Sequence, residues 1–168
     1  MSATDKSDHE RRDTHDTAVD ASRPGANGWL TAHTAPAGYR TIITARGFQF
    51  VADEPTTAGG TDGGPTPYEY LLAALGSCTA MTLRMYAARK GWPLDDVVVR
   101  LRDTRSHATD CANCETESVG IQRIERQVEL HGRLTDEQRR RLLDVADRCP
   151  IKQTLERGLA IAPATRAG

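Results

Sequence analysis

Residues 66–89 read TPYEYLLAALGSCTAMTLRMYAAR, and this stretch decides how the rest of the chain must fold. Apolar and small side chains such as Leu71, Leu75 and Cys78 recur in it at spacings of three and four. That spacing is typical of an α-helix with one apolar stripe. Gly91 follows and is suited to ending the helix. The stretch therefore predicts a helix longer than twenty residues that lies at the centre of the fold.

The start of this helix carries its own signals. Thr66 is suited to the N-cap, Pro67 to the first helical position, and Glu69 to the third position of a capping box. A direct contact of Glu69 with Cys78 within one chain is disfavoured, because nine residues along a helix correspond to about 13 Å. Glu69 therefore either caps its own helix or reaches a sulfur across a dimer interface.

The residues before this helix predict an antiparallel meander. Three runs rich in β-branched and aromatic side chains, 29–34, 39–45 and 48–52, are separated by turn residues. The stretch 53–67 is rich in Gly and Pro and is long for a loop in a compact domain, which is typical of functional loops. It lacks the Lys-Ser or Lys-Thr of a phosphate-binding loop.

The residues after the helix predict further strands and helices. We expect a strand from 97 to 101 that extends towards 106, a strand at 121–130, a helix capped by Thr135, a short helix from Pro150 through Leu155, and a last strand at 159–162. Because strands and helices come in separate runs, the order favours the α+β fold class.

Charge and composition narrow the function further. The chain has 22 basic and 23 acidic residues and a net charge of −1, so no footprint for nucleic acid is indicated. No apolar run is long enough to span a membrane, and the polar start excludes a secretory signal, so we expect a cytoplasmic protein. Residues 1–27 are predicted to be a disordered tail, and residues 28–168 a single domain.

The cysteines are the residues with the clearest chemistry. Cys149 precedes Pro150, so it is expected at a helix N-cap, where backbone N–H groups stabilise a thiolate. Arg148 and Lys152 flank it and would add to this effect. Cys78 lies in the middle of the long helix, so the residues alone leave it either as a core side chain or as a reactive thiol with a partner from elsewhere.

A second cluster lies between the two later strands. His107, Cys111 and Cys114 form a CxxC with a nearby histidine, three ligands of the kind that bind zinc. A structural zinc site needs a fourth ligand, which a carboxylate, His131 or a partner chain would supply. The pair is alternatively a redox couple, or the segment is a flexible loop in which a metal or a disulfide is optional.

Two stretches together resemble the OsmC/Ohr family. They are GGPTPYEYLLAALGSCTAMT at 63–82 and DRCPIKQTL at 147–155, and the resemblance extends over about residues 39–162. The Leu-Gly-Ser-Cys-Thr version is more similar to the less characterised OsmC-like branch than to the established organic hydroperoxide reductases. The resemblance implies an intertwined homodimer with antiparallel sheets around two long central helices.

The resemblance also implies an activity. The characterised members of the family reduce organic hydroperoxides, with one cysteine oxidised to a sulfenic acid and a second that resolves it as a disulfide, which a dithiol reduces. By position, Cys78 resembles the peroxidatic cysteine and Cys149 the resolving one. A glutamate and an early-strand arginine assist; Glu69 and either Arg40 or Arg46 are the candidates. The family's glutamate follows the helix-opening proline directly, whereas here Tyr68 takes that place.

No cofactor is expected for such a thiol peroxidase. Two other functions are compatible with the residues. One is a metal-binding or redox-sensing protein that uses His107, Cys111 and Cys114, with zinc as the metal. The other is a dimeric protein that binds a small apolar ligand without turnover.

Overall fold

The computed structural model describes residues 28–106 and 120–166. The predicted disordered tail at 1–27 lies outside the described residues. The chain divides into two compact units, of which the first ends at Pro65 and the second begins at Thr66. That residues 28–168 form a single domain stays a prediction.

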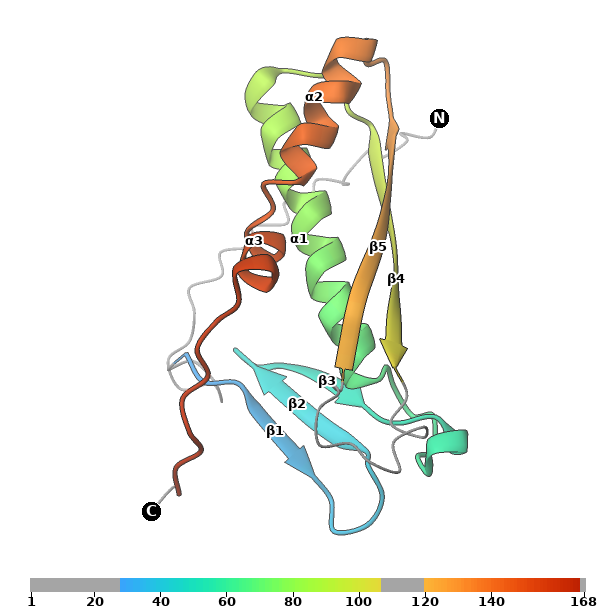
Figure 1. The fold of residues 1–168 in the computed structure, drawn as a ribbon, viewed down its shortest axis with the longest axis vertical. Coiled ribbons are helices and arrows are strands. Elements are labelled where there is room, and N and C mark those ends of the chain that lie inside the picture. The colour runs from blue at the N-terminus through green and yellow to red at the C-terminus, as the bar shows by residue number, and fades with distance from the viewer. Residues whose placement is uncertain (1–27, 107–119, 167–168) are drawn as a thin grey trace, which may run out of the picture. The chain divides into compact units, whose positions relative to one another are not determined.

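The N-terminal unit contains the predicted meander. Strands β1 (Thr31–Thr34), β2 (Thr41–Ala45) and β3 (Phe48–Ala52) form an antiparallel sheet in that order (Figure 1). Arg46 and Gly47 join β2 to β3, and both have positive φ angles, of 50° and 82°. Two consecutive residues with positive φ match the right-handed twist of the flanking strands. This local conformation explains why a two-residue connection suffices.

The loop after β3 is organised around a buried carboxylate. Asp53 accepts hydrogen bonds from the backbone N–H groups of Glu54 (2.9 Å), Thr61 (3.0 Å) and Gly63 (3.1 Å), and from the Thr61 hydroxyl (2.5 Å). The Thr61 hydroxyl is the largest cause that lowers the pKa of Asp53 to about 2. The short 3-10 helix η1 (Thr56–Ala58) lies within this loop. The Gly-rich stretch is therefore a folded loop that hydrogen bonds to the Asp53 carboxylate hold in place.

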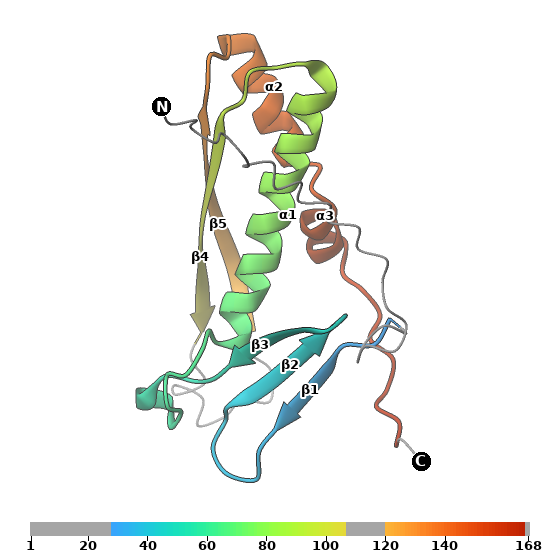
Figure 2. The same cartoon turned by 180° about the vertical axis from the view of Figure 1, so that it is seen from behind.

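The C-terminal unit is built on the long helix. Its elements are α1 (Pro67–Lys90), β4 (Asp96–Ser106), β5 (Gly120–His131), α2 (Asp136–Ala146) and α3 (Pro150–Arg157). Strands β4 and β5 pair antiparallel, and α1 lies along this two-stranded ribbon. Helices α2 and α3 pack against α1 (Figures 1 and 2). The runs of strands and helices confirm the predicted α+β class.

The start of α1 has the predicted capping box. The Thr66 hydroxyl accepts from the backbone N–H of Glu69 (3.3 Å), and the Glu69 carboxylate accepts from the backbone N–H of Thr66 (2.7 Å). Thr135 and Gln138 form the same box at the start of α2. Gly91 ends α1 with a φ of 64°. Local sequence signals thus set the bounds of both helices.

The core of the C-terminal unit lies between α1 and α2. Leu83 and Leu142 are fully buried there, with Val145 and Ala146 beside them. By length and composition alone, α1 is long and apolar enough to cross a membrane. Within the C-terminal unit it packs against β4, α2 and α3.

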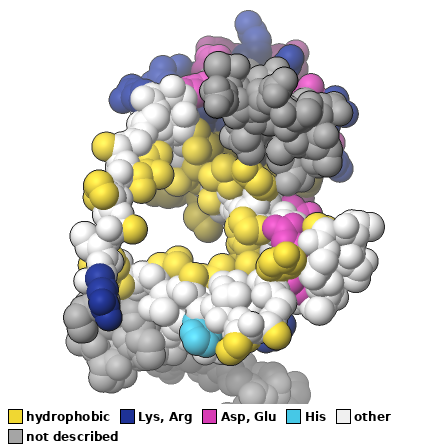
Figure 3. All heavy atoms as spheres, turned by 60° about the horizontal axis from the view of Figure 1, so that its bottom comes forward, with side chains coloured by type: hydrophobic (Ala, Val, Ile, Leu, Met, Phe, Trp, Pro, Cys, Tyr) yellow, Lys and Arg dark blue, Asp and Glu magenta, His cyan; other side chains and the backbone are white. Residues whose placement is uncertain are grey.

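The predicted strand at 159–162 does not form. This segment is irregular after α3, and Leu159 and Ile161 remain 62% and 85% exposed. A strand needs a hydrogen-bonded neighbour, and none of the described strands pairs with this segment. Hydrophobic side chains also reach the surface elsewhere in the described protein, as Figure 3 shows for one face.

Candidate thiol site

The C-terminal unit brings Cys78 and Cys149 together. Cys78 lies in the middle of α1 and is partly buried, and Cys149 is the N-cap of α3 and fully buried. Both are free thiols, and each contributes to the shift in the pKa of the other. Packing of α3 against α1 therefore supplies the polar partner that the helix of Cys78 lacks by itself.

The environment of Cys149 favours its thiolate. Burial raises the pKa of Cys149, but hydrogen bonds outweigh it and the pKa is lowered. They come from the Cys78 thiol, the backbone N–H groups of Lys152 and Ile151, and the Thr79 hydroxyl. Cys149 makes no conventional cap hydrogen bond of the kind seen at Thr66; the N–H groups at the start of α3 act on the larger sulfur instead. The predicted place of Cys149 at the N-cap of a helix is confirmed, and its role as a reactive sulfur stays a prediction.

The environment of Cys78 has the opposite effect. Burial is the largest cause that raises the pKa of Cys78, and the adjacent Cys149 sulfur raises it further. Two interacting sulfurs lose their protons in two steps that belong to the pair. The raised pKa of Cys78 and the lowered pKa of Cys149 are therefore properties of the pair, in which each sulfur acts on the other.

Thr79 and Arg126 belong to this site and were not among the predicted residues. Thr79 is fully buried, and its hydroxyl accepts a hydrogen bond from Nη1 of Arg126 (3.2 Å). Arg126 lies on β5, on the same face as Ile124 and Val128, where the alternation calls for apolar side chains. A charged residue at an inward position of an alternating strand is the signal that could have identified it.

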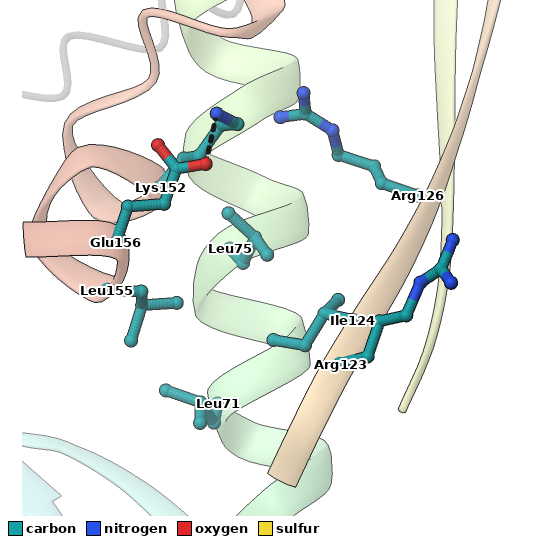
Figure 4. Close-up of a pocket in the computed structure, with 8 residues that line it drawn as sticks. All are labelled: Leu71, Leu75, Arg123, Ile124, Arg126, Lys152, Leu155 and Glu156. Carbon is teal, nitrogen blue, oxygen red and sulfur yellow. Dashed lines mark hydrogen bonds and ion pairs between the residues drawn. The ribbon is translucent and has the colours of Figure 1, made fainter. Parts of the chain in front are cut away.

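A cavity of about 400 Å³ lies between α1, β5 and α3 in the C-terminal unit. Figure 4 shows Leu71 and Leu155 at one end and Arg126 with the Lys152–Glu156 ion pair at the other. Neither sulfur is among its lining residues, but Arg126 and Lys152 belong both to the cavity and to the surroundings of Cys149. The cavity therefore has apolar walls from four residues, Arg123 beside Ile124, and a charged end near the thiols.

The other predicted site residues lie elsewhere. Glu69 is part of the capping box at the start of α1. Arg40 and Arg46 belong to the N-terminal unit, where Arg40 lines a cavity of about 260 Å³ and Arg46 lies over the ring of Phe48, 5.8 Å from its centroid. That any of the three acts on a thiol stays a prediction. Of the two residues that flank Cys149 in sequence, Arg148 is exposed, whereas Lys152 directs its backbone N–H at the sulfur.

The predicted zinc ligands His107, Cys111 and Cys114 lie outside the described residues. Within the described ranges, 28–106 and 120–166, no group of three or more His, Cys, Asp or Glu side chains is placed to hold a metal ion. The zinc site at the CxxC stays a prediction.

Comparison with known families identifies the family of this chain. The family model described as OsmC-like protein matches residues 60–163, which include both cysteines. The chain belongs to the OsmC-like protein family.

Solved structures of the same fold extend the comparison. An OsmC-like protein from Mycoplasma pneumoniae is 23% identical with a TM-score of 0.63, and the match covers 76% of this chain and 86% of that one. An organic hydroperoxide resistance protein OsmC from Legionella pneumophila is 19% identical with a TM-score of 0.56, over 76% and 87% of the two chains. A third, an organic hydroperoxide resistance protein from Elizabethkingia anophelis, is 18% identical with a TM-score of 0.54, over 75% and 86%. A search of curated proteins finds no match. Membership of this family suggests a redox or stress role.

Proposed function

We propose that this protein is a cytoplasmic thiol peroxidase that reduces organic hydroperoxides through Cys78 and Cys149. The observation that carries the proposal is the pair of facing sulfurs, one of them at the start of a helix. Cys78 is the sulfur that is partly open to its surroundings, whereas Cys149 is fully buried. Access therefore favours Cys78 as the sulfur that meets the peroxide.

The lowered pKa of Cys149 gives it a second task as a proton carrier. The Cys149 thiolate first takes the proton of the Cys78 thiol, which creates the nucleophile at the accessible position. The Cys78 thiolate then attacks the terminal peroxide oxygen, an S–O bond forms and the O–O bond breaks, and an alkoxide leaves. Cys149 returns the proton to the alkoxide, which gives the alcohol, and becomes a thiolate again.

The same thiolate completes the reaction. Cys149 attacks the sulfenic sulfur of Cys78, an S–S bond forms, and hydroxide leaves and takes up a proton to become water. The hydroperoxide has then accepted two electrons and the cysteine pair has lost two. A dithiol reductant returns two electrons and two protons to the disulfide and is itself oxidised to a disulfide. No cofactor enters the cycle.

The cavity beside the thiols suits the organic part of the substrate. Its volume of about 400 Å³ is in the range of sites for small molecules, and Leu71, Leu75, Ile124 and Leu155 give it an apolar lining. We propose that the alkyl chain of the hydroperoxide lies here. The peroxide group would then face the charged end near the thiols.

A homodimer is part of this proposal. Met81 and Met85 on α1 are 65% and 72% exposed, although they belong to the longest and most apolar helix. Exposed apolar surface of this kind is typical of a face that a partner covers. A second copy would bring two long helices together at the centre of the assembly. Glu69 and either Arg40 or Arg46 would assist the thiols, as the family resemblance implies.

Peroxide treatment of a variant with only two cysteines tests the activity. In Cys111→Ser, Cys114→Ser protein, any disulfide within one chain must join Cys78 to Cys149. One equivalent of cumene hydroperoxide is expected to give this disulfide by mass spectrometry, and Cys78→Ser in the same background is expected to abolish peroxide consumption. If neither the disulfide nor a sulfenate forms, the proposal is wrong.

A further inference from the structure

We propose that Arg126 is a positioning residue that holds Cys149 in place and favours its thiolate. The proposal rests on the proposed thiol function, but its claim concerns one arginine on β5 that neither the sequence pattern nor the family resemblance assigns. Arg126 is largely buried, with 15% of its side chain exposed. A buried cation requires partners, and those of Arg126 surround the turn that carries Cys149.

The first connection runs through the backbone. Nη1 of Arg126 donates to the carbonyl oxygen of Ala146 (3.0 Å), and the backbone N–H of Cys149 donates to the same oxygen (3.3 Å). Ala146 is the last residue of α2, whose final carbonyl groups lack partners within the helix. Arg126 therefore fixes the turn between α2 and α3 at the point where the backbone of Cys149 is attached.

The second connection runs through Thr79, the neighbour of Cys78 on α1. Its hydroxyl accepts from Nη1 of Arg126 (3.2 Å), and the hydroxyl proton serves the carbonyl of Leu75 (2.8 Å) or the sulfur of Cys149. A hydroxyl that accepts from a cation is a better donor in turn. Arg126 thus polarises the group that faces the sulfur.

The charges around Cys149 indicate that Arg126 favours the thiolate form of Cys149. Asp147 would disfavour a thiolate, but its carboxylate accepts from Nη2 of Arg126 (2.6 Å) and lies 3.8 Å from Nζ of Lys152. Lys152 also pairs with Glu156 (2.6 Å) on α3. Cys78 on α1 acts on Cys149 from the other side, Arg148 precedes Cys149 and is exposed, and Arg123 lines the adjoining cavity with Arg126. Without Arg126, Asp147 would keep only the more distant ammonium.

Titration of Cys149 alone tests the proposal without any use of peroxidase activity. In the full chain with Cys78→Ser, Cys111→Ser and Cys114→Ser, Cys149 is the sole thiol, and a serine hydroxyl replaces the donor at 78. The far-ultraviolet absorbance of the thiolate is followed against pH. Arg126→Gln is expected to lower the thiolate fraction at neutral pH at least about threefold. Arg126→Lys keeps the charge but lacks the two guanidinium nitrogens that donate together, so it is expected to lower the thiolate fraction less.

Companion variants separate this role from a merely structural one. Thr79→Val is expected to lower the thiolate fraction, Thr79→Ser to leave it unchanged, and Asp147→Asn to restore part of the loss in Arg126→Gln. Arg102→Gln is the matched control, because Arg102 pairs with Glu125 on the surface with 79% of its side chain exposed. If Arg126→Gln and Arg126→Lys fold and titrate like the control, the proposal is overturned. If the Cys149 titration shifts in the Arg126 variants while the unmodified protein consumes no peroxide, the role of Arg126 stands and only the proposed peroxidase activity is contradicted.

Discussion

Two helices of the C-terminal unit begin with a cap residue followed by proline, Thr66-Pro67 at α1 and Cys149-Pro150 at α3. At α1 the cap is an oxygen, and Glu69 closes a capping box around it. At α3 the cap is a sulfur, and the free N–H groups of the first turn face it without a carboxylate to compete. The same backbone geometry thus stabilises a helix in one place and an anion in the other.

The largest effect is expected when the N-cap sulfur of α3 is replaced by an oxygen, as at the start of α1. Cys149→Ser keeps a good N-cap oxygen, so the helix start is retained. It removes both the proton carrier and the resolving thiol, so steady-state turnover of hydroperoxide with a dithiol is expected to fall on the order of a hundredfold. A coupled assay with dithiol consumption measures this, and a sulfenate at Cys78 is expected to accumulate. Turnover at the unmodified rate would show that Cys149 is dispensable.

The pH dependence of Cys78 oxidation, the first step of the proposed reaction, should reveal the ionisation of Cys149 at the start of α3. Because the Cys149 thiolate must accept the proton of Cys78, oxidation of Cys78 in a single turnover slows as pH falls below the pKa of Cys149. The loss approaches about tenfold per pH unit. Since that pKa is lowered, the fall lies on the acid side of the usual range for a thiol. Stopped-flow measurement across this range, with Thr79→Val as comparison, is expected to show the fall at higher pH in the variant. A rate independent of pH would contradict the proton-carrier role.

A smaller effect is expected at the α1 start. Thr66→Ala removes the cap oxygen and is expected to lower the free energy of unfolding by about 1 kcal/mol. Thr135→Ala at α2 is the matched control, because it removes the same group from the same kind of box on an exposed surface. Urea unfolding of both variants measures the difference. An unchanged midpoint for Thr66→Ala would mean that the box contributes nothing.

The two starts also show what a sequence can predict here. The caps at Thr66 and Cys149 are local features, because the residues that define them lie within one helical turn, and the helix bounds followed from them. Arg126 is marked only by its place on β5, and its partners come from α1 and from the α2–α3 turn. No local pattern could join it to Cys149. The strand expected at 159–162 was wrong for a related reason, since a strand depends on a neighbour rather than on its own residues.

The smallest change is expected at Glu69, for which the residues alone leave two possible roles. Glu69→Gln makes the α1 start like that of α2, where Gln138 accepts the backbone N–H of Thr135 at 3.0 Å. A glutamine closes a capping box as glutamate does, so the free energy of unfolding should change by no more than about 0.5 kcal/mol. If capping is its whole task, the rate of Cys78 oxidation stays within about threefold of the unmodified protein. A fall of about tenfold or more at unchanged stability would instead require the negative charge itself. Because the variant keeps the hydrogen bond and removes the charge, such a fall would assign the Glu69 carboxylate to the thiol chemistry and distinguish the α1 start from that of α2.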